Sequence, residues 1–190
     1  QDDTVVTIDP PKDNLPQSKS VTLQAGQSAI LYNHWSDGGM TGKRISSNNP
    51  VAVYSHHGCA NVVTPACDHL AEQIPPTNTW GTDYVTVPLA TRAKDWFMLI
   101  ADQADTTVSI TDANGTRTQI LAAGQRIQWE NNLTQVIAAD KPILVAQLSE
   151  GTLVDNVDSD PFLAFVPTVE QGTTRATLVT PSVGQNHHYL

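Results

Sequence analysis

Short runs of β-branched and aromatic residues, separated by turn residues, follow one another along the whole chain. Such runs fit the pleated, half-buried surface of a β-strand, and no stretch has a convincing amphipathic helical pattern. A single helical turn is expected at Asp68–Gln73, ended by Pro75-Pro76. The predicted strands are Val5–Ile8, Val21–Gln24, Ala29–Tyr32, Val51–His56, Tyr84–Val87, Trp96–Ala101, Thr107–Ile110, Gln119–Leu121, Arg126–Trp129, Ile143–Leu148, Phe162–Val166 and Thr174–Val179. The pattern therefore predicts an all-β protein.

Asn114-Gly115 stands between two of the predicted strands. Both residues tolerate a positive φ, which a tight two-residue turn requires. The dipeptide therefore predicts a β-hairpin that joins Thr107–Ile110 to Gln119–Leu121.

The pattern of residues 1–98 recurs in residues 105–190. The offset between matching residues falls from 102 (Asp3 to Asp105) to 98 (Leu23 to Leu121) and then holds at 92 (Pro50 to Pro142). The matching segments are Asp3–Ile8 with Asp105–Ile110, Leu23–Gln27 with Leu121–Gln125, Pro50–Val53 with Pro142–Val145, and Asp68, Leu70 and Pro75 with Asp160, Phe162 and Pro167. Repetition of a unit of this size is typical of modular arrays.

The repeat predicts two tandem antiparallel β-sandwich units of the Ig-like kind, residues 1–101 and 102–190, each with seven or eight strands. Asn186–Leu190 falls where the first unit has Asp95–Leu99. We therefore expect the second unit to be truncated within its last strand and more sequence to follow in the native protein. The chain also begins without methionine, so we expect a mature product or an excised fragment with flanking domains.

The composition excludes several classes of function. A hydrophobic content of 39% and a mean hydropathy of −0.24 fit a soluble globular chain, and no apolar run reaches the roughly 18 residues of a membrane helix. The net charge of −9 leaves no basic stripe for a nucleic acid. We therefore expect neither membrane insertion nor nucleic-acid binding.

Cys59 and Cys67 are the two cysteines of the chain. Because the chain carries no cytosolic marker, we expect a disulfide between them, with a chain-entropy contribution of roughly 2.6 kcal/mol for so short a ring. The alternative is a metal site that adds His56, His57 or His69. His56 and His57 are adjacent on a predicted strand and point to opposite faces, so they cannot easily bind one ion. Two thiols alone do not make a structural zinc site, so the disulfide is the favoured interpretation.

The second unit has Gly151 and Ser159 at the positions that match the two cysteines. The loop between them and the next residue carry carboxylates of the kind that bind calcium, and the candidate ligands are Asp155, Asp158 and Asp160. Pro161 stands where an EF-hand needs glycine, so only a simpler Ca²⁺ site is compatible with this loop. The alternative is a solvated acidic loop.

The chain offers no catalytic residues that we can assign. Gly-x-Ser-x-Gly and His-Glu-x-x-His motifs are absent. His56 is expected to face the core and His57 the solvent, since they are neighbours on a predicted strand. Trp80, which follows Pro75-Pro76, is interpreted as a plug at the edge of the sandwich.

Residues 40–101 carry the densest resemblance to a known family. The segments concerned are Ile45–Ser55, Cys59, Cys67–Pro76 and Trp80-Gly81. Together they resemble the N-terminal domain family of IgG Fc-binding protein, which occurs in a mucus-associated animal protein and in bacterial surface proteins. The resemblance implies an extracellular, β-rich tandem module with a Cys59–Cys67 bridge. It supplies no catalytic residues, and Fc binding is recorded for one member, whereas this chain shows no motif that recognises antibody.

The leading hypothesis is a non-enzymatic binding or adhesion module of a larger secreted or surface-anchored protein. Its ligand would be a glycan or a protein on a host or mucus surface, through residues that the sequence leaves unknown. The alternatives are a structural spacer and a metal-dependent hydrolase. A spacer should keep its units interchangeable, but the loops Asp9–Pro16, His34–Lys43 and Cys59–Cys67 differ between the units. Differentiated loops favour binding.

Overall fold

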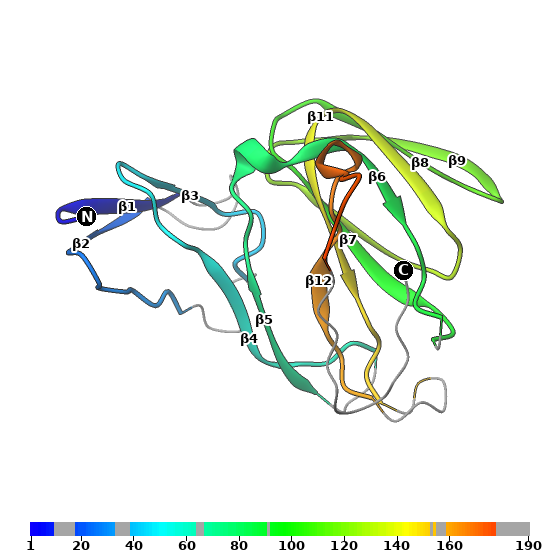
Figure 1. Cartoon of the computed structure of the whole chain (residues 1–190), viewed down its shortest axis with the longest axis horizontal. Helices are drawn as coiled ribbons and strands as arrows, with labels where there is room; N and C mark the ends of the chain where they lie inside the picture. The colour runs from blue at the N-terminus through cyan, green and yellow to red at the C-terminus, as the bar shows by residue number, and fades with distance from the viewer. Residues whose placement is uncertain are drawn as a thin grey trace.

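The computed structural model describes residues 1–9, 18–32, 39–63, 67–90, 92–152, 154 and 159–177 (Figure 1). These residues form β-strands and two 3₁₀ turns with no α-helix, so the prediction of an all-β protein is confirmed. None of these residues belongs to a helix long and apolar enough to cross a membrane. In chain order the elements are β1 (Thr4–Asp9), β2 (Lys19–Leu23), β3 (Arg44–Ser47), β4 (Tyr54–Ala60), β5 (Asp68–Gln73), η2 (Thr77–Thr79), β6 (Gly81–Thr86), β7 (Asp95–Ala101), β8 (Thr106–Asp112), β9 (Gly115–Leu121), β10 (Arg126–Asn131), β11 (Gln135–Leu148), β12 (Leu163–Phe165) and η3 (Val169–Gln171).

The first part of the chain forms two small antiparallel sheets. One has the order β2-β1-β3, and the other is the β4–β5 hairpin. In Figure 1 the hairpin lies between the three-stranded sheet, drawn in blue, and the larger sheet on the right. Val6 and Ile8 of β1 are the buried apolar residues of the three-stranded sheet.

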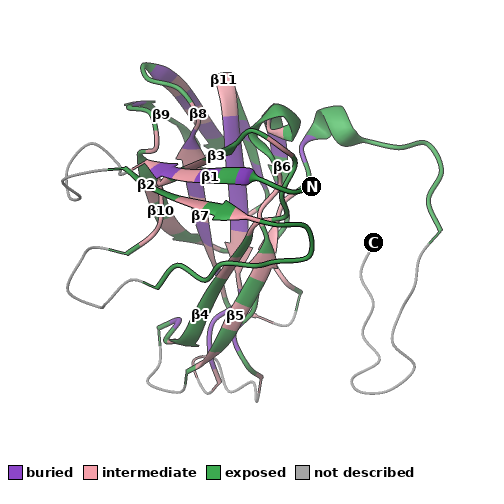
Figure 2. Cartoon of the chain, turned by 90° about the vertical axis from the view of Figure 1, so that its left-hand side faces the viewer, coloured by how far each residue is buried: buried purple, intermediate pink, exposed green. Residues whose placement is uncertain are grey.

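The larger sheet has seven strands, and β11 is its centre. The first part of β11 pairs with β6 and β8, and its second part pairs with β7 and β12. The register on β6 shifts between Ala138 and Ile143, so the two parts of β11 serve different neighbours and the sheet curls over its own face. The residues enclosed there are Tyr84, Leu99, Ala101, Val108, Ile110, Leu121, Ile137, Ile143 and Val145, each at most 3% exposed. Figure 2 shows this burial concentrated along β8 and β11.

The seven-stranded sheet combines strands from both sides of Ala101. It takes β6 and β7 from before Asp102, and β8 to β12 from after it. The two parts of the chain also meet where Gly42 and Gly124 bring their backbones together, since a Cβ on Gly124 would lie 2.7 Å from the carbonyl oxygen of Gly42. Arg44 adds an ion pair with Asp102 at 2.6 Å.

Strand pairs in the two parts of the chain have the same registers. The pairs β1–β2, β1–β3 and β4–β5 correspond residue by residue to β8–β9, β8–β11 and β11–β12, with the offsets of 102, 98 and 92 that the sequence shows. Examples are Thr4 with Leu23 against Thr106 with Leu121, Ile8 with Ile45 against Ile110 with Ile137, and Tyr54 with Gln73 against Ala146 with Phe165. The turns η2 and η3 are also 92 residues apart.

Several local predictions differ from the structure. The helical turn at Asp68–Gln73 is wrong, because this segment is β5 and pairs with β4. The strand at Ala29–Tyr32 is wrong, because these residues form no strand. Of the strand at Thr174–Val179, residues 174–177 form none and the last two lie outside the described residues. The hairpin between β8 and β9 is confirmed, but its turn differs from the prediction. Asp112 pairs with Gly115, so Ala113 and Asn114 form the turn; Gly115 has a φ of 125°, whereas Asn114 has no positive φ.

Candidate functional site

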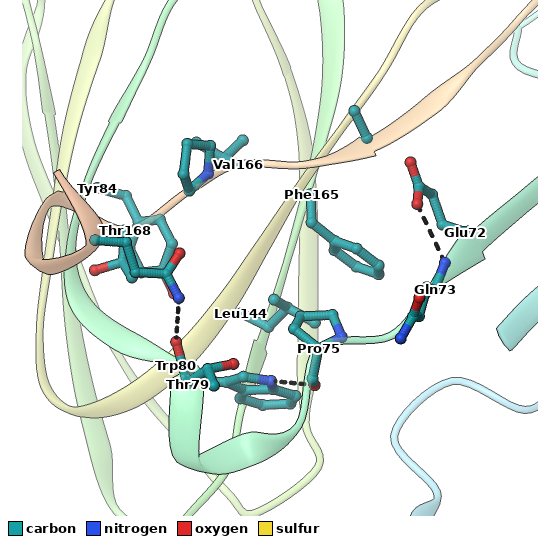
Figure 3. Close-up of a pocket in the computed structure, with 13 residues that line it drawn as sticks. Glu72, Gln73, Pro75, Thr79, Trp80, Tyr84, Leu144, Phe165, Val166 and Thr168 are labelled. Atoms are coloured by element: carbon teal, nitrogen blue, oxygen red, sulfur yellow. Dashed lines mark hydrogen bonds between the residues drawn. The ribbon is translucent and has the colours of Figure 1, made fainter. Parts of the chain in front are cut away.

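A cavity of about 310 Å³ lies where the segment that follows β5 meets the segment that follows β12 (Figure 3). Its walls come from positions that match at the offset of 92: Gln73 faces the same space as Phe165, and Thr79 the same space as Gln171. Its volume is at the lower end of the range for small-molecule sites, which is about 300–1,000 Å³. The cavity therefore has room for one side chain or one sugar ring.

Trp80 forms the aromatic wall on the side of η2. Its indole Nε1 donates a hydrogen bond to the carbonyl oxygen of Pro75 at 2.9 Å, as the dashed line in Figure 3 shows. Phe165 stands on the opposite wall, at the end of β12. Both side chains are only partly buried, so they retain apolar surface that a ligand can cover.

Tyr84 and Leu144 close the inner end of the cavity. Tyr84 is 1% exposed, and its hydroxyl donates to the carbonyl oxygen of Ile143 at 2.5 Å and accepts from the N–H of Gly81 at 3.1 Å. Burial raises the pKa of this phenol above its ordinary value. Tyr84 is therefore a neutral, fixed part of the wall at physiological pH.

The polar groups of the cavity are suited to hydrogen bonding. The lining includes Glu72, whose carboxylate accepts from the N–H of Gln73 at 3.1 Å, and Gln171, whose Nε2 donates to the carbonyl oxygen of Thr79 at 3.0 Å. Among the described lining residues there is no histidine, cysteine or lysine that could act with Glu72 as an acid–base pair.

The turn η3 is attached to the start of β6 by a second set of contacts. The carboxylate of Glu170 accepts hydrogen bonds from the N–H and the hydroxyl of Thr82, both at 2.9 Å. The bond from the N–H of Thr82 is the main reason that the pKa of Glu170 lies below its ordinary value. Thr168 is buried against Gly81, where a Cβ would collide with its hydroxyl. These contacts hold the η3 wall of the cavity in place.

Cys59 and Cys67 form a disulfide, with their Cα atoms 5.0 Å apart. The nearby histidines do not gather around it as metal ligands would. His57 accepts a hydrogen bond from the N–H of Cys59, and His69 lies against Asp68 at 3.1 Å. In the part of the chain that the structure describes, no cluster of three candidate metal ligands is found.

The prediction that His56 faces the core is wrong, because His56 is exposed together with His57. The reason lies in the sheet. Among the described residues the β4–β5 hairpin is a two-stranded sheet, and no residue of β4 is buried, so neither face of the strand packs into a core there.

The matching loop of the second part is bridged by an arginine that the sequence did not indicate. The guanidinium of Arg92 donates to the carbonyl oxygen of Gly151 at 3.1 Å and also to the hydroxyl of Ser159. Gly151 and Ser159 are the residues that match Cys59 and Cys67. The N–H of Gly151 donates to the carbonyl oxygen of Val62 at 3.0 Å, so the two loops also touch.

The predicted calcium ligands are only partly visible. Asp155 and Asp158 lie outside the described residues, and Asp160 is exposed at the end of the loop. The calcium site therefore stays a prediction.

Comparison with known proteins identifies relatives of the chain. The family model described as IgGFc binding protein matches residues 1–190. The chain is similar to the human IgGFc-binding protein, with 33% identity over 152 residues, or 78% of this chain. The chain spans only 3% of the length of that relative. No solved structure matches the chain.

Proposed function

The chain belongs to the IgGFc-binding protein family, and from this we propose that it is a non-enzymatic binding module of an extracellular protein, with a protein as its ligand. The name of the human relative describes binding of an antibody fragment by a much longer protein. We extend to this chain the role in protein recognition, and we take the Fc fragment of IgG as the first probe.

The cavity between η2 and η3 is the observation that carries this proposal. Protein interfaces depend on a few anchoring side chains that fill well-packed pockets, and aromatic residues are enriched there. Trp80 and Phe165 offer partly exposed aromatic surface on opposite walls, and Gln171 and Glu72 place polar groups at its rim. A cavity of about 310 Å³ admits one anchoring side chain of a partner.

We also propose that the chain arose by duplication of one unit, so that residues 1–101 and 102–190 descend from a common β-sandwich. The shared registers of three strand pairs support this, as does the match between η2 and η3. Asp3 and Asp105, which match at the offset of 102, both adopt a positive φ, 55° and 56°. A duplicated unit in tandem is typical of extracellular modules.

Two substitutions of phenylalanine by alanine test the ligand site. Phe165→Ala removes one wall of the cavity, whereas Phe162→Ala removes a phenylalanine that is 42% exposed and does not line the cavity. Binding of immobilised Fc fragment should weaken at least about tenfold in the first variant, as the loss of an anchoring contact implies, and should stay unchanged in the second. Trp80→Ala should behave like Phe165→Ala.

Two outcomes would contradict the proposal. If Phe165→Ala and Phe162→Ala bind Fc alike, the cavity is not the site. If the unmodified chain binds sugars on a glycan array and neither Fc nor any other plasma protein, the ligand is a glycan. Circular dichroism of both variants shows whether an effect on binding comes from loss of fold.

A further inference from the structure

In the larger sheet, β6 and β7 pair with three segments, which are β10 and the two parts of β11. Leu99 of β7 pairs on one side with Ile127 of β10 and on the other with Val145, in the second part of β11. β6 pairs with the first part of β11, where Tyr84 lies opposite Ile137. These two strands therefore complete the sheet on which the core depends.

The matching edges of the first part of the chain have no such strands among the described residues. Ser28–Leu31 matches the start of β10 at the offset of 98 but forms no strand. β4, which matches the second part of β11, pairs with β5 alone, and β3, which matches its first part, pairs with β1 alone. One strand equivalent to β6 would pair with β3. One strand equivalent to β7 would pair with both β4 and Ser28–Leu31.

Apolar side chains along these edges are also more exposed than their counterparts in the second part of the chain. Val51 is 37% exposed where its counterpart Ile143 is fully buried, and Tyr54 is 67% exposed where its counterpart Ala146 is 6% exposed. Leu31, on the segment that matches β10, is 42% exposed, whereas its counterpart Trp129 packs partly buried against the core. Apolar side chains grouped along unpaired strand edges mark a site for pairing with another chain segment. In Figure 2 the β4–β5 hairpin is drawn mostly as exposed.

The chain itself carries a segment that matches the missing strands. At the offset of 92, residues 173–190 correspond to residues 81–98, which contain β6 and the start of β7. The alternation around Ala176 and Leu178 predicts a strand. Thr173–Thr177 is nevertheless exposed and forms no strand, so this stretch is available for pairing elsewhere.

We propose that the edges of Ser28–Leu31, β3 and β4 together form an acceptor for a strand pair, and that residues 173–190 of a second copy of the chain occupy it. The inference depends on the proposed duplication and is independent of the ligand site. Its chemistry is strand addition, in which backbone hydrogen bonds supply affinity and inward apolar side chains supply register.

The geometry predicts a head-to-tail arrangement. The donor residues 173–190 lie in the second part of the chain, and the acceptor residues lie in the first part. Because donor and acceptor lie at opposite ends of the chain, the contact is heterologous and repeats from copy to copy.

Three proteins test this inference. The first is the unmodified chain, and the second ends at Gly172 and so lacks the donor. The third carries an extra copy of residues 81–102 placed directly before Gln1, a position that reproduces the native connection because Gln1 matches Gln103. A control version of the third protein has Phe97→Asp and Leu99→Asp in the extra copy only. Sedimentation velocity over a range of concentrations measures association, and amide hydrogen exchange measures pairing of Ser28–Leu31 and Val51–Tyr54.

The unmodified chain should associate as concentration rises, and the chain that ends at Gly172 should stay monomeric. The graft should fill the acceptor within one molecule, abolish association and slow exchange of both segments by at least about tenfold, whereas the control graft should do neither. If the graft leaves exchange unchanged, there is no acceptor. If the graft slows exchange but the unmodified chain never associates, the occupant is not a second copy. Phe165→Ala should associate like the unmodified chain. A failure of strand addition can therefore be distinguished from a failure of Fc binding at the cavity.

Discussion

Gln171 donates a hydrogen bond to the carbonyl oxygen of Thr79 at 3.0 Å, and these two residues are each the last residue of a 3₁₀ turn, 92 positions apart. Matching elements of the two parts of the chain therefore touch at the cavity. Both walls come from the same position of the repeat, yet the side chains that they present differ, since Gln73 and Thr79 oppose Phe165 and Gln171. One turn supplies a backbone acceptor and the other a side-chain donor.

Gln171→Ala should lower the free energy of unfolding by about 0.5–1 kcal/mol, because an exposed hydrogen bond contributes modestly and water can replace it at the carbonyl of Thr79. Urea unfolding measures the change. Gln119→Ala is the control, since Gln119 is also exposed and stands away from the cavity on β9. An equal loss in both variants would show that the contact between the turns adds nothing.

Gly124→Ala should destabilise the fold more than Gly26→Ala. Both glycines have a positive φ, 72° and 79°, so both substitutions strain the backbone by about 1–2 kcal/mol. Only at Gly124 would the new methyl group lie 2.7 Å from the carbonyl oxygen of Gly42, whereas at Gly26 nothing lies within 4 Å. Overpacking should add about 1–3 kcal/mol at Gly124. Urea midpoints that are the same for both variants would mean that the loops separate at no cost.

Acid should weaken the attachment of η3 to β6. The N–H of Thr82 lowers the pKa of Glu170 below its ordinary value near 4.5. A lowered carboxylate pKa stabilises the fold above the pKa of the unfolded chain, and this stability is lost as pH falls through the folded pKa. The difference in unfolding free energy between the unmodified chain and Glu170→Gln should therefore be greatest at neutral pH and shrink below about pH 4.5. A difference that is constant with pH would show that the charge of Glu170 is irrelevant.

Loss of the disulfide should destabilise the first part of the chain. Replacement of Cys59 and Cys67 by serine should lower the free energy of unfolding by about 2.6 kcal/mol, because the short ring restricts the unfolded chain. Mass spectrometry without reductant should find the unmodified chain lighter by about two hydrogens than its reduced form, as S–S bond formation requires. Two thiols that alkylate freely in the native protein would contradict the bond.

Calcium should stabilise the loop that precedes β12. If Asp155, Asp158 and Asp160 bind Ca²⁺, the thermal midpoint should rise in millimolar Ca²⁺ and fall again with chelator, since an ion bound only by the folded state stabilises it. Replacement of Asp155 and Asp158 by asparagine should remove the effect. Identical melting in Ca²⁺ and in chelator would leave this stretch as a solvated acidic loop.

The strands that could be predicted from sequence are those whose pattern is local. Val5–Ile8 and Trp96–Ala101 alternate or run apolar over their whole length, and both are strands in the structure. β5 was missed because its leucine, alanine, glutamate and glutamine favour helices, and only pairing with β4 overrides that preference. Ala29–Tyr32 has a strand composition but no described strand beside it, and a strand needs a neighbour to satisfy its backbone groups.

Only one wall of the candidate site, the one around Pro75 and Trp80, can be predicted from the sequence. The sequence places Trp80 close to Pro75, but Phe165 and Gln171 come from residues about 90 positions away, and only folding brings them together. The offset of 92 was the available signal, since it links Gln73 to Phe165 and Thr79 to Gln171. Arg92 gave no such signal, because nothing near it in the chain marks it as the bridge between Gly151 and Ser159.

In the proposed duplication the boundary of the repeat differs from the boundary of the sheet, because β6 and β7 belong to residues 1–101 but pair with strands of residues 102–190. This difference would affect a protein that lengthens by adding repeats. Each added repeat would bring the first two strands of the next sheet together with the remaining strands of its own. An array of any length would then have one open end that accepts strands and one that donates them. Lengthening by recombination would therefore extend the reach of the protein without adding new exposed edges.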